Sequence, residues 1–124
     1  MLVDTDILID YFRGVEAAIV FVESNIDQLT ISAITVAELY QGVRDGRERE
    51  ALGDFISAVN VIEVSQEIAM AAGLYRREFR KSHNLGLADC LIAATANLNR
   101  SPLRTLNTKH FPMMEDVSAP YSKE

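Results

Sequence analysis

The chain has 124 residues and a mass of 13.8 kDa, which is the size of a single domain. Hydrophobic residues make up 48% of the sequence and charged residues 24%, and this composition excludes an intrinsically disordered protein. The net charge of −6 argues against a protein that binds nucleic acid through a basic surface, unless clustered carboxylates hold a cation that supplies positive charge.

The first half of the chain predicts two strands separated by helices. The strands are recognised as short apolar or alternating runs, and the helices by apolar residues three and four positions apart, such as Val36, Leu39 and Val43. We expect strands over residues 1–4 and 29–32, and helices over residues 7–12, 15–24, 35–43 and 48–59.

The second half of the chain continues this alternation. Ser65 is a suitable N-cap for a long helix, and Leu87, Leu91 and Leu98 lie on one face of another. We expect helices over residues 66–81 and 87–98, strands over residues 61–64 and 102–107, and a fifth short strand within residues 114–119.

Strands that alternate with helices predict an α/β fold with a parallel sheet between two layers of helices. We therefore expect a single domain over residues 1–124, a three-layer α/β/α sandwich around a mainly parallel sheet of four to five short strands. A short polar tail is expected at about residues 119–124. Ligands of such sheets bind at the carboxyl ends of the strands, where the strand order reverses. Polar residues that follow strands are therefore the candidates for a functional site.

The sequence favours a cytoplasmic protein without a membrane span. The longest stretches without a charged residue, 28–37 and 90–99, have ten residues each, whereas a transmembrane helix needs about 20. The N-terminal segment carries three Asp and no basic residue before Arg13, unlike a signal peptide. Cys90 is the only cysteine, which excludes an internal disulfide and favours a reducing compartment.

Two acids follow the first predicted strand. Asp4 stands where that strand ends, and Asp6 comes two residues later. One member of the Asp4-Thr5-Asp6 trio could serve only to cap the following helix, because these side chains accept hydrogen bonds from backbone N–H groups. A single cap does not need two acids, so a functional role for them stays open.

Glu38 also has two interpretations. Thr35 and Glu38 match a capping box, in which Thr35 caps the helix and Glu38 reaches back to it, and taken alone this is the simpler interpretation. The same placement puts Glu38 in the first turn of a helix that follows a strand. From there its carboxylate can point over the edge of the sheet.

Asp89 lies in the first turn of the helix predicted over residues 87–98, where interaction with the helix dipole could account for it. The remaining faces of that helix are nearly all apolar, which predicts a buried helix. A carboxylate at the start of a buried helix is costly unless it is paired or bound to a metal.

Thr105 and Asn107 offer a hydroxyl and a carbonyl oxygen after the last clear strand, although turn chemistry also explains the asparagine. With Asp4, Glu38 and Asp89 they are expected at one edge of the sheet. Hard divalent cations such as Mg²⁺ and Mn²⁺ prefer oxygen ligands and would relieve the repulsion between three acids. Metal ions held in this way activate water for phosphoryl chemistry.

Four segments carry a resemblance to a known family. In chain order they are LVDTDILIDYF, SAITVAELYQGV, LADCLIAATA and TLNTKHF, and the match covers nearly the whole chain. These segments resemble the PIN-domain ribonucleases, and in size and layout the chain is similar to the VapC-type toxins of toxin–antitoxin pairs. The third segment is the most specific of the four.

The resemblance implies a PIN-like fold with a catalytic, metal-binding set of acids. The family's first aspartate, its glutamate and its next aspartate fall on Asp4, Glu38 and Asp89. Asp4 and Asp89 would ligate Mg²⁺, directly or through water, and Mn²⁺ would substitute for it. Glu38 would ligate the ion or act as the general base toward the attacking water.

Three further positions are implied to support this set. Asp6 and Asn107 would make outer contacts to the metal, and Thr105 matches a threonine that helps to position water or a ligand oxygen. Asn107 is a departure, because many members of the family carry a fourth acid there. The missing charge implies one well-held ion, with a second recruited by the RNA phosphate.

The activity that the resemblance implies is endonucleolytic cleavage of RNA that leaves 5′-phosphate and 3′-hydroxyl ends. The implied partners are the RNA substrate, a VapB-type antitoxin that blocks the site, and a second copy of the chain in a homodimer. Arg13, Arg44 and Arg47 lie just downstream of the candidate site elements and are the expected phosphate contacts. The basic run at residues 76–81 is better explained as a solvated helix face.

Three other classes of protein fit parts of the sequence. Asp4 and Asp6 after a strand also suit a haloacid-dehalogenase-type phosphatase, although no Asp-Asp or Asp-x-x-x-Asp pair follows Asp54. His83 and His110 could support metal-free RNA cleavage, which would resist EDTA and leave cyclic phosphate ends. A non-catalytic PIN-like module that binds protein or RNA is the third, and the presence of all three family acids argues against it.

Overall fold

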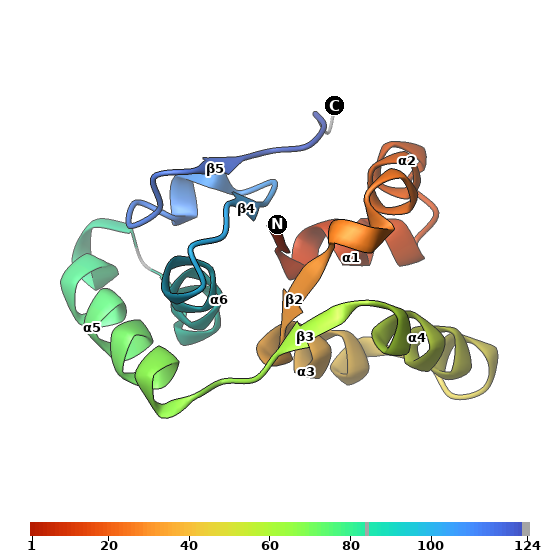
Figure 1. The fold of residues 1–124 in the computed structure, drawn as a ribbon, viewed down its shortest axis with the longest axis horizontal. Coiled ribbons are helices and arrows are strands. Elements are labelled where there is room, and N and C mark those ends of the chain that lie inside the picture. Colours follow the sequence, from red (N-terminus) through yellow and green to blue (C-terminus); the bar gives the residue numbers. More distant parts are fainter. Residues whose placement is uncertain (84, 123–124) are drawn as a thin grey trace.

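The computed structural model describes residues 1–83 and 85–122. Within these residues the chain forms five short strands, six α-helices and two 3-10 helices (Figure 1). The strands are β1 (Leu2–Val3), β2 (Thr30–Ser32), β3 (Asn60–Ile62), β4 (Leu103–Arg104) and β5 (Val117–Ser118). The helices are α1 (Thr5–Phe12), α2 (Glu16–Ser24), α3 (Ala33–Gly42), α4 (Arg47–Ala58), α5 (Gln66–His83) and α6 (Leu87–Leu98), with the 3-10 helices η1 (Ile26–Gln28) and η2 (Thr108–His110).

The five strands pair in one parallel sheet in the order β3-β2-β1-β4-β5. β1 lies in the centre, and the chain adds strands first on the β2 side and later on the β4 side. The strand order therefore reverses between β1 and β4, which is where parallel sheets bind ligands. The predicted parallel α/β sheet is confirmed.

The central strand separates two apolar layers, because successive side chains of a strand point to opposite faces. Val3 packs in a cluster with residues of α1, α2, α3 and α4, whereas Leu2 packs in a cluster with residues of α6. A third cluster, around Ile68 and Cys90, joins α5 to α6. Figure 1 shows α5 and α6 together on one side of β2 and β3, and α1, α2 and α4 on the other. The three-layer α/β/α architecture is confirmed.

The start of α3 differs from the prediction. Ser32 is the N-cap, and its hydroxyl accepts a hydrogen bond from the backbone N–H of Ile34 at 3.1 Å. The capping box expected from Thr35 and Glu38 is wrong, because the helix already runs through Thr35 and Glu38 lies in the second turn. Ser32 is a suitable cap in its own right and is reached first by a chain leaving β2.

The remaining elements differ from the predictions mainly in length. The helix over residues 87–98 is confirmed, and Ser65 caps α5 as predicted, accepting from the Ile68 N–H at 3.1 Å. The strands expected over residues 61–64 and 102–107 are shorter, and the two 3-10 helices were not expected. No helix of the described residues is long and apolar enough to cross a membrane.

The segment expected to be a polar tail is held on the domain as far as Tyr121. Ser118 pairs with Arg104 in the sheet. The ring of Tyr121 packs against the first apolar cluster, and its hydroxyl donates a hydrogen bond to the buried carboxylate of Asp10 in α1 at 2.8 Å. The ring packing and the hydrogen bond of Tyr121 therefore hold this polar segment against the domain.

Candidate active site at the carboxyl edge of the sheet

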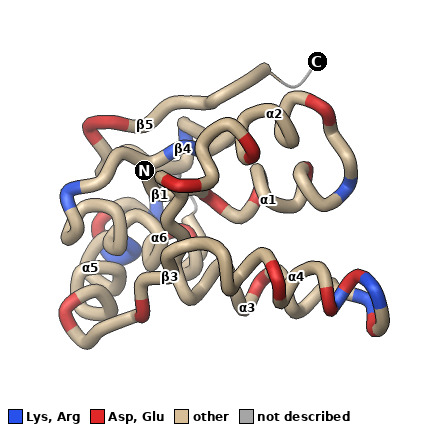
Figure 2. Tube along the Cα trace, turned by 45° about the vertical axis from the view of Figure 1, so that its right-hand side comes forward, with Lys and Arg blue, Asp and Glu red and all other residues tan. Residues whose placement is uncertain are grey.

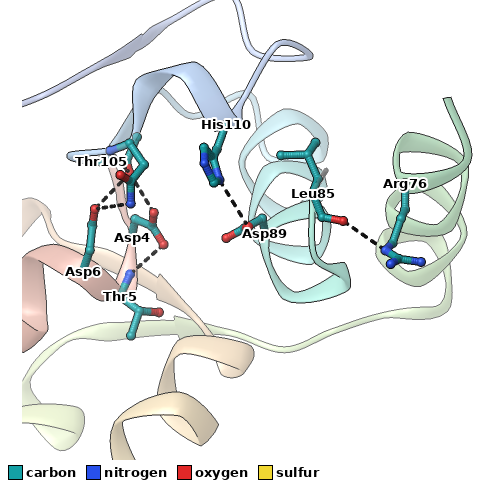
Figure 3. A network of polar contacts seen from close by, with 9 residues as sticks. Asp4, Thr5, Asp6, Arg76, Leu85, Asp89, Thr105 and His110 are labelled. Carbon is teal, nitrogen blue, oxygen red and sulfur yellow. Dashed lines mark hydrogen bonds and ion pairs between the residues drawn. The ribbon is translucent and has the colours of Figure 1, made fainter. Parts of the chain in front are cut away.

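Asp4 follows β1 directly, at the point where the strand order reverses, and is only 6% exposed. It is the N-cap of α1, and its Oδ1 accepts a hydrogen bond from the Thr5 N–H at 2.8 Å. Its Oδ2 accepts one from the hydroxyl of Thr105, just after β4, at 2.7 Å (Figure 3). Asp4 therefore caps a helix and belongs to the polar cluster, so that both interpretations drawn from the sequence hold.

Burial and two neighbouring acids make the surroundings of Asp4 unfavourable for its negative charge. Burial first, and then the nearby charges of Asp6 and Asp89, raise the pKa of Asp4 to about 7, against the hydrogen bonds from Thr105 and Thr5, which lower it. A carboxyl group whose pKa is displaced by burial and by like charges is a common mark of a functional site. A bound cation would reverse this balance.

Asp6 turns toward the loop that follows β4 (Figure 3). Its Oδ2 accepts from the Leu106 N–H at 2.9 Å, from the Thr105 hydroxyl at 3.3 Å and from the Asn107 side-chain amide at 3.4 Å. Its Oδ1 is buried and has no hydrogen-bond partner among the described residues. Burial raises the pKa of Asp6 as well. A buried carboxylate oxygen left without a partner is costly and fits the outer contact of a cation.

Glu38 reaches the site from α3 rather than folding back on its own helix. Its Oε1 accepts a hydrogen bond from the hydroxyl of Thr5 at 2.7 Å, and that hydroxyl also contacts the hydroxyl of Thr35 at 2.9 Å. No hydrogen bond from the described residues reaches its Oε2. Thr5 thus connects Glu38 to the end of β1 that carries Asp4.

Asp89 lies in the first turn of α6, as predicted, and its side chain is 35% exposed. Its charge acts on Asp4, which places the two acids in the same electrostatic environment. The Nδ1 of His110, in η2, is 3.8 Å from its Oδ2. Figure 3 shows His110 and Asp89 facing the side of the sheet edge occupied by Asp4 and Thr105.

The donor chemistry of this edge fits a hard divalent cation. Every side chain placed there by β1, α1, α3 and the loop after β4 offers oxygen, and the raised pKa of Asp4 and the orphaned Asp6 Oδ1 reflect negative charge without compensation. Among the described residues no three acidic, His or Cys side chains stand close enough to hold an ion by themselves. That arrangement suits Mg²⁺, which binds through one or two carboxylates and fills its remaining positions with water and substrate phosphate.

The predicted phosphate contacts are divided between two environments. Arg13 and Arg47 line a largely apolar cavity of about 460 Å³ between α1, α3 and α4, and Glu38 lines the same cavity. Arg44 is exposed and forms a long ion pair with Glu48, 3.9 Å between Nε and Oε2. Figure 2 shows basic and acidic positions side by side in this segment between α3 and α4. The structure therefore brings Arg13 and Arg47 to the cavity that Glu38 also lines, whereas Arg44 is not among the residues that line it.

Another arginine is less exposed than expected. Arg76, predicted on a solvated face of α5, is half-buried and donates a hydrogen bond from Nε to the backbone carbonyl of Leu85 at 3.1 Å (Figure 3). This contact fastens the segment just before α6, the helix that carries Asp89. The long aliphatic stem of arginine allows such partial burial while the guanidinium keeps a polar partner.

Thr5 and Thr35 were considered from the sequence only as possible helix caps, and neither was predicted to belong to the site. Thr35 is fully buried and Thr5 nearly so. The hydrogen-bond partners of Thr5, which are Thr35 and Glu38, lie in a different helix and at least 30 positions away in the sequence. The one available signal was a threonine between two acids, which the cap interpretation already explained.

The geometry also bears on the alternative classes. Each oxygen of Asp4 accepts one hydrogen bond and keeps a further lone pair, which a metal ion or a phosphatase substrate could use, so Asp4 alone does not decide between the two classes. Of the histidine pair, His110 stands beside Asp89, and the side chain of His83 lies outside the described part of the chain.

Known proteins similar to this chain share its fold and most of its length. The family model of the PIN domain matches residues 1–114. Ribonuclease VapC10 of Mycobacterium tuberculosis is 41% identical over an alignment of 125 residues, which covers 98% of this chain and 93% of the relative. Ribonuclease VapC19 of the same species is 40% identical over 124 residues, covering 97% and 98%. A solved toxin–antitoxin complex from Klebsiella pneumoniae contains a chain with a TM-score of 0.84 and 37% identity, and the match covers 98% of each chain.

Proposed function

Because the chain belongs to the PIN domain family, and its similar relatives are VapC ribonucleases, we propose that it is the ribonuclease toxin of a toxin–antitoxin pair. In finer terms, we propose a Mg²⁺-dependent endoribonuclease that hydrolyses RNA phosphodiester bonds and leaves 5′-phosphate and 3′-hydroxyl ends. The observation that carries this proposal is Asp4, a buried carboxylate at the strand-order reversal whose charge is opposed by Asp6 and Asp89.

The metal would be held by Asp4 and Asp89, with Asp6 and Asn107 as outer contacts. When bound, Mg²⁺ supplies a polarised water and stabilises charge on the phosphate. Thr105 keeps Asp4 in place from the β4 side, and its hydroxyl is fully committed to the two acids next to it. The proposed ligands and outer contacts thus come from the end of β1, the first turns of α1 and α6 and the loop after β4, which lie far apart in the sequence.

Glu38 is proposed as the general base. Its Oε1 is held by Thr5, so that Oε2 is the oxygen available to accept a proton from water. In this role it would collect the proton released when water attacks phosphorus.

RNA would lie across the cavity beside Glu38. Arg13 and Arg47 line that cavity and are proposed to contact the RNA phosphates, with Arg44 contributing from the exposed segment. Exchange of either cavity arginine for Ala should raise KM for RNA and reduce the dependence of binding on salt, while kcat changes little.

The partner of this chain is proposed to be a VapB-type antitoxin, because the similar chain from Klebsiella pneumoniae was solved in a toxin–antitoxin complex. Ile9, Phe12 and Leu39 give the cavity next to Glu38 an apolar lining that a partner segment could fill, which would block access to the acids. A homodimer and a cytoplasmic location are proposed on the strength of the family resemblance.

The test is expression of the chain in cells without its antitoxin, with new RNA 5′ ends mapped across the transcriptome. Growth arrest with discrete 5′-phosphate ends that are absent for Asp4→Asn is the expected result. Arrest that persists in Asp4→Asn without new ends would instead establish a non-catalytic binding module. In vitro, EDTA should abolish cleavage, and cyclic phosphate ends made in EDTA would overturn the metal mechanism.

A further inference from the structure

We propose that Thr5 is a positioning residue for Glu38, and that Thr35 orients the Thr5 hydroxyl for this task. The inference rests on the proposed role of Glu38 as the general base. It assigns a function to two threonines that neither bind the metal nor contact RNA in the mechanism above.

Thr5 holds two carboxylates at once. Its backbone N–H donates to Oδ1 of Asp4 at 2.8 Å, and its side-chain hydroxyl donates to Oε1 of Glu38 at 2.7 Å. In Figure 3 the Thr5 nitrogen faces Asp4 while its side chain points away from that carboxylate. Because Asp4 follows β1 and Glu38 belongs to α3, this single residue fixes the spacing between acids of two different elements.

Thr35 supports the orientation of the Thr5 hydroxyl by donating a hydrogen bond to its oxygen. A hydroxyl has one proton to donate, and the Thr5 oxygen lies within hydrogen-bond distance of both Glu38 and Thr35. The carboxylate is the stronger acceptor, so the Thr5 proton points to Glu38 and Thr35 donates to Thr5. Thr35 is fully buried and Thr5 is 5% exposed, which keeps water from competing for either bond.

The consequence for Glu38 is a fixed orientation. A glutamate in the second turn of a helix has several rotamers, and only some direct a carboxylate oxygen into the site. With Oε1 bound to Thr5, Oε2 is the oxygen without a hydrogen-bond partner among the described residues, and Glu38 lines the cavity between α1, α3 and α4. Removal of the Thr5 hydroxyl would leave the Glu38 carboxylate unaltered in its chemistry, but its side chain would be free to adopt other rotamers.

The experiment compares Thr5→Val, which keeps the shape of the side chain but cannot donate, with Thr5→Ser, which restores the hydroxyl. Thr5→Val should lower kcat about 10- to 100-fold with KM for RNA nearly unchanged, and Thr5→Ser should recover most of the rate. In a Glu38→Gln background Thr5→Val should have no further effect, because it acts only through Glu38. The affinity of the free protein for Mn²⁺, measured by calorimetry, should be unchanged in Thr5→Val, because neither Thr5 nor Glu38 holds the metal in the proposed mechanism.

Thr95→Val is the matched control. Thr95 is also fully buried and donates to a backbone carbonyl, that of Leu91, at 2.7 Å within α6. It should lose stability as Thr5→Val does while retaining the activity of the unaltered chain. If Thr5→Val fails to fold, Thr35→Val removes the second hydroxyl of the pair and carries the same comparison.

Each outcome is decisive. Full activity in Thr5→Val and Thr35→Val, or an equal loss of rate in the Glu38→Gln background, would overturn the inference alone. Full activity in Glu38→Gln would overturn the proposed general base, and the role of Thr5 with it. The two failures are distinguished by which variant stays active.

Discussion

Asp4 is both a helix cap and a buried member of a cluster of acids, and these two surroundings have opposite effects on its negative charge. As the cap of α1 and the acceptor for Thr105 it is well supplied with hydrogen bonds, yet it is buried beside two further acids. Hydrogen bonds from neutral donors stabilise the carboxylate less than burial and like charges destabilise it, and its pKa rises accordingly. The metal-free protein therefore stores at this residue a cost that a bound cation removes.

This cost predicts a pH dependence of stability. The pKa of Asp4 is about 7 in the folded protein and 3.8 in the unfolded chain, so its protonated form is favoured by folding. That contribution is fully present below pH 3.8 and is lost as the pH rises through 7. In EDTA, the free energy of unfolding from urea titrations should fall across this range by on the order of 2–4 kcal/mol relative to Asp4→Asn. Parallel pH profiles of the two proteins would contradict the raised pKa.

Asn107 offers a second test at the scale of one residue. Its amide donates to Oδ2 of Asp6 at 3.4 Å, so Asn107→Asp places a fourth carboxylate against the half-buried Asp6. We expect this variant to destabilise the metal-free protein and to bind Mn²⁺ more tightly, with a second ion detected by calorimetry. An unchanged stoichiometry and affinity would show that position 107 does not contribute to the metal site.

At the scale of elements, α3 delivers Glu38 and is anchored by its cap. Ser32 is fully buried at the junction of β2 and α3, where its hydroxyl satisfies the Ile34 N–H. Thr35 and Glu38, the residues that match a capping box, instead point across to α1. At the start of α3, Ser32 therefore stabilises the helix, whereas Thr35 and Glu38 contribute to the site.

Exchange of the cap should separate these roles. Ser32→Ala is expected to lower the free energy of unfolding by about 1 kcal/mol, because it removes an N-cap. Glu38→Gln should leave stability nearly unchanged, since Glu38 caps nothing, while it strongly lowers kcat and leaves a residual rate. Thermal unfolding of the two variants checks this. If Glu38→Gln destabilised the protein as much as Ser32→Ala does, the interpretation of Thr35 and Glu38 as a capping box would be supported after all.

The sequence predicted most elements because their signals are local. The helix from Leu87 to Leu98 has an apolar pattern that begins and ends at its bounds, and Asp4, Glu38 and Asp89 follow predicted strands or begin predicted helices. The choice between Ser32 and Thr35 as cap could not be made, because both fit the local rule. The contact from Thr5 to Glu38 spans 33 positions between two helices, and only the packing of α1 against α3 creates it.

For the whole molecule, the order of the strands explains why the site forms where it does. β1 is flanked by β2 and β4, so that Asp4 meets α3 on one side and the loop after β4 on the other. The last described residues close the arrangement, since Tyr121 packs on the first apolar cluster and bonds to Asp10. The two ends of the chain thus contribute to one folded unit.

The Tyr121 contact predicts a stability effect far from the acids. Asp10 is 2% exposed, and Tyr121→Phe withdraws one donor from its carboxylate while preserving the packing of the ring. We expect a loss of about 1–2 kcal/mol in the free energy of unfolding, measured in urea, with kcat and KM unchanged. A loss of activity larger than the loss of folded protein would show that this segment also acts on the site.

The central position of β1 has a consequence during synthesis. β1 is synthesised well before its neighbour β4 and the hydroxyl of Thr105, which follows Asp4 by 101 positions. A nascent chain that has emerged only as far as α6 carries Asp4, Glu38 and Asp89 without the strand that pairs with β1 on this side. The hydrogen bond that holds Asp4 from the β4 side therefore forms only after Thr105 has left the ribosome.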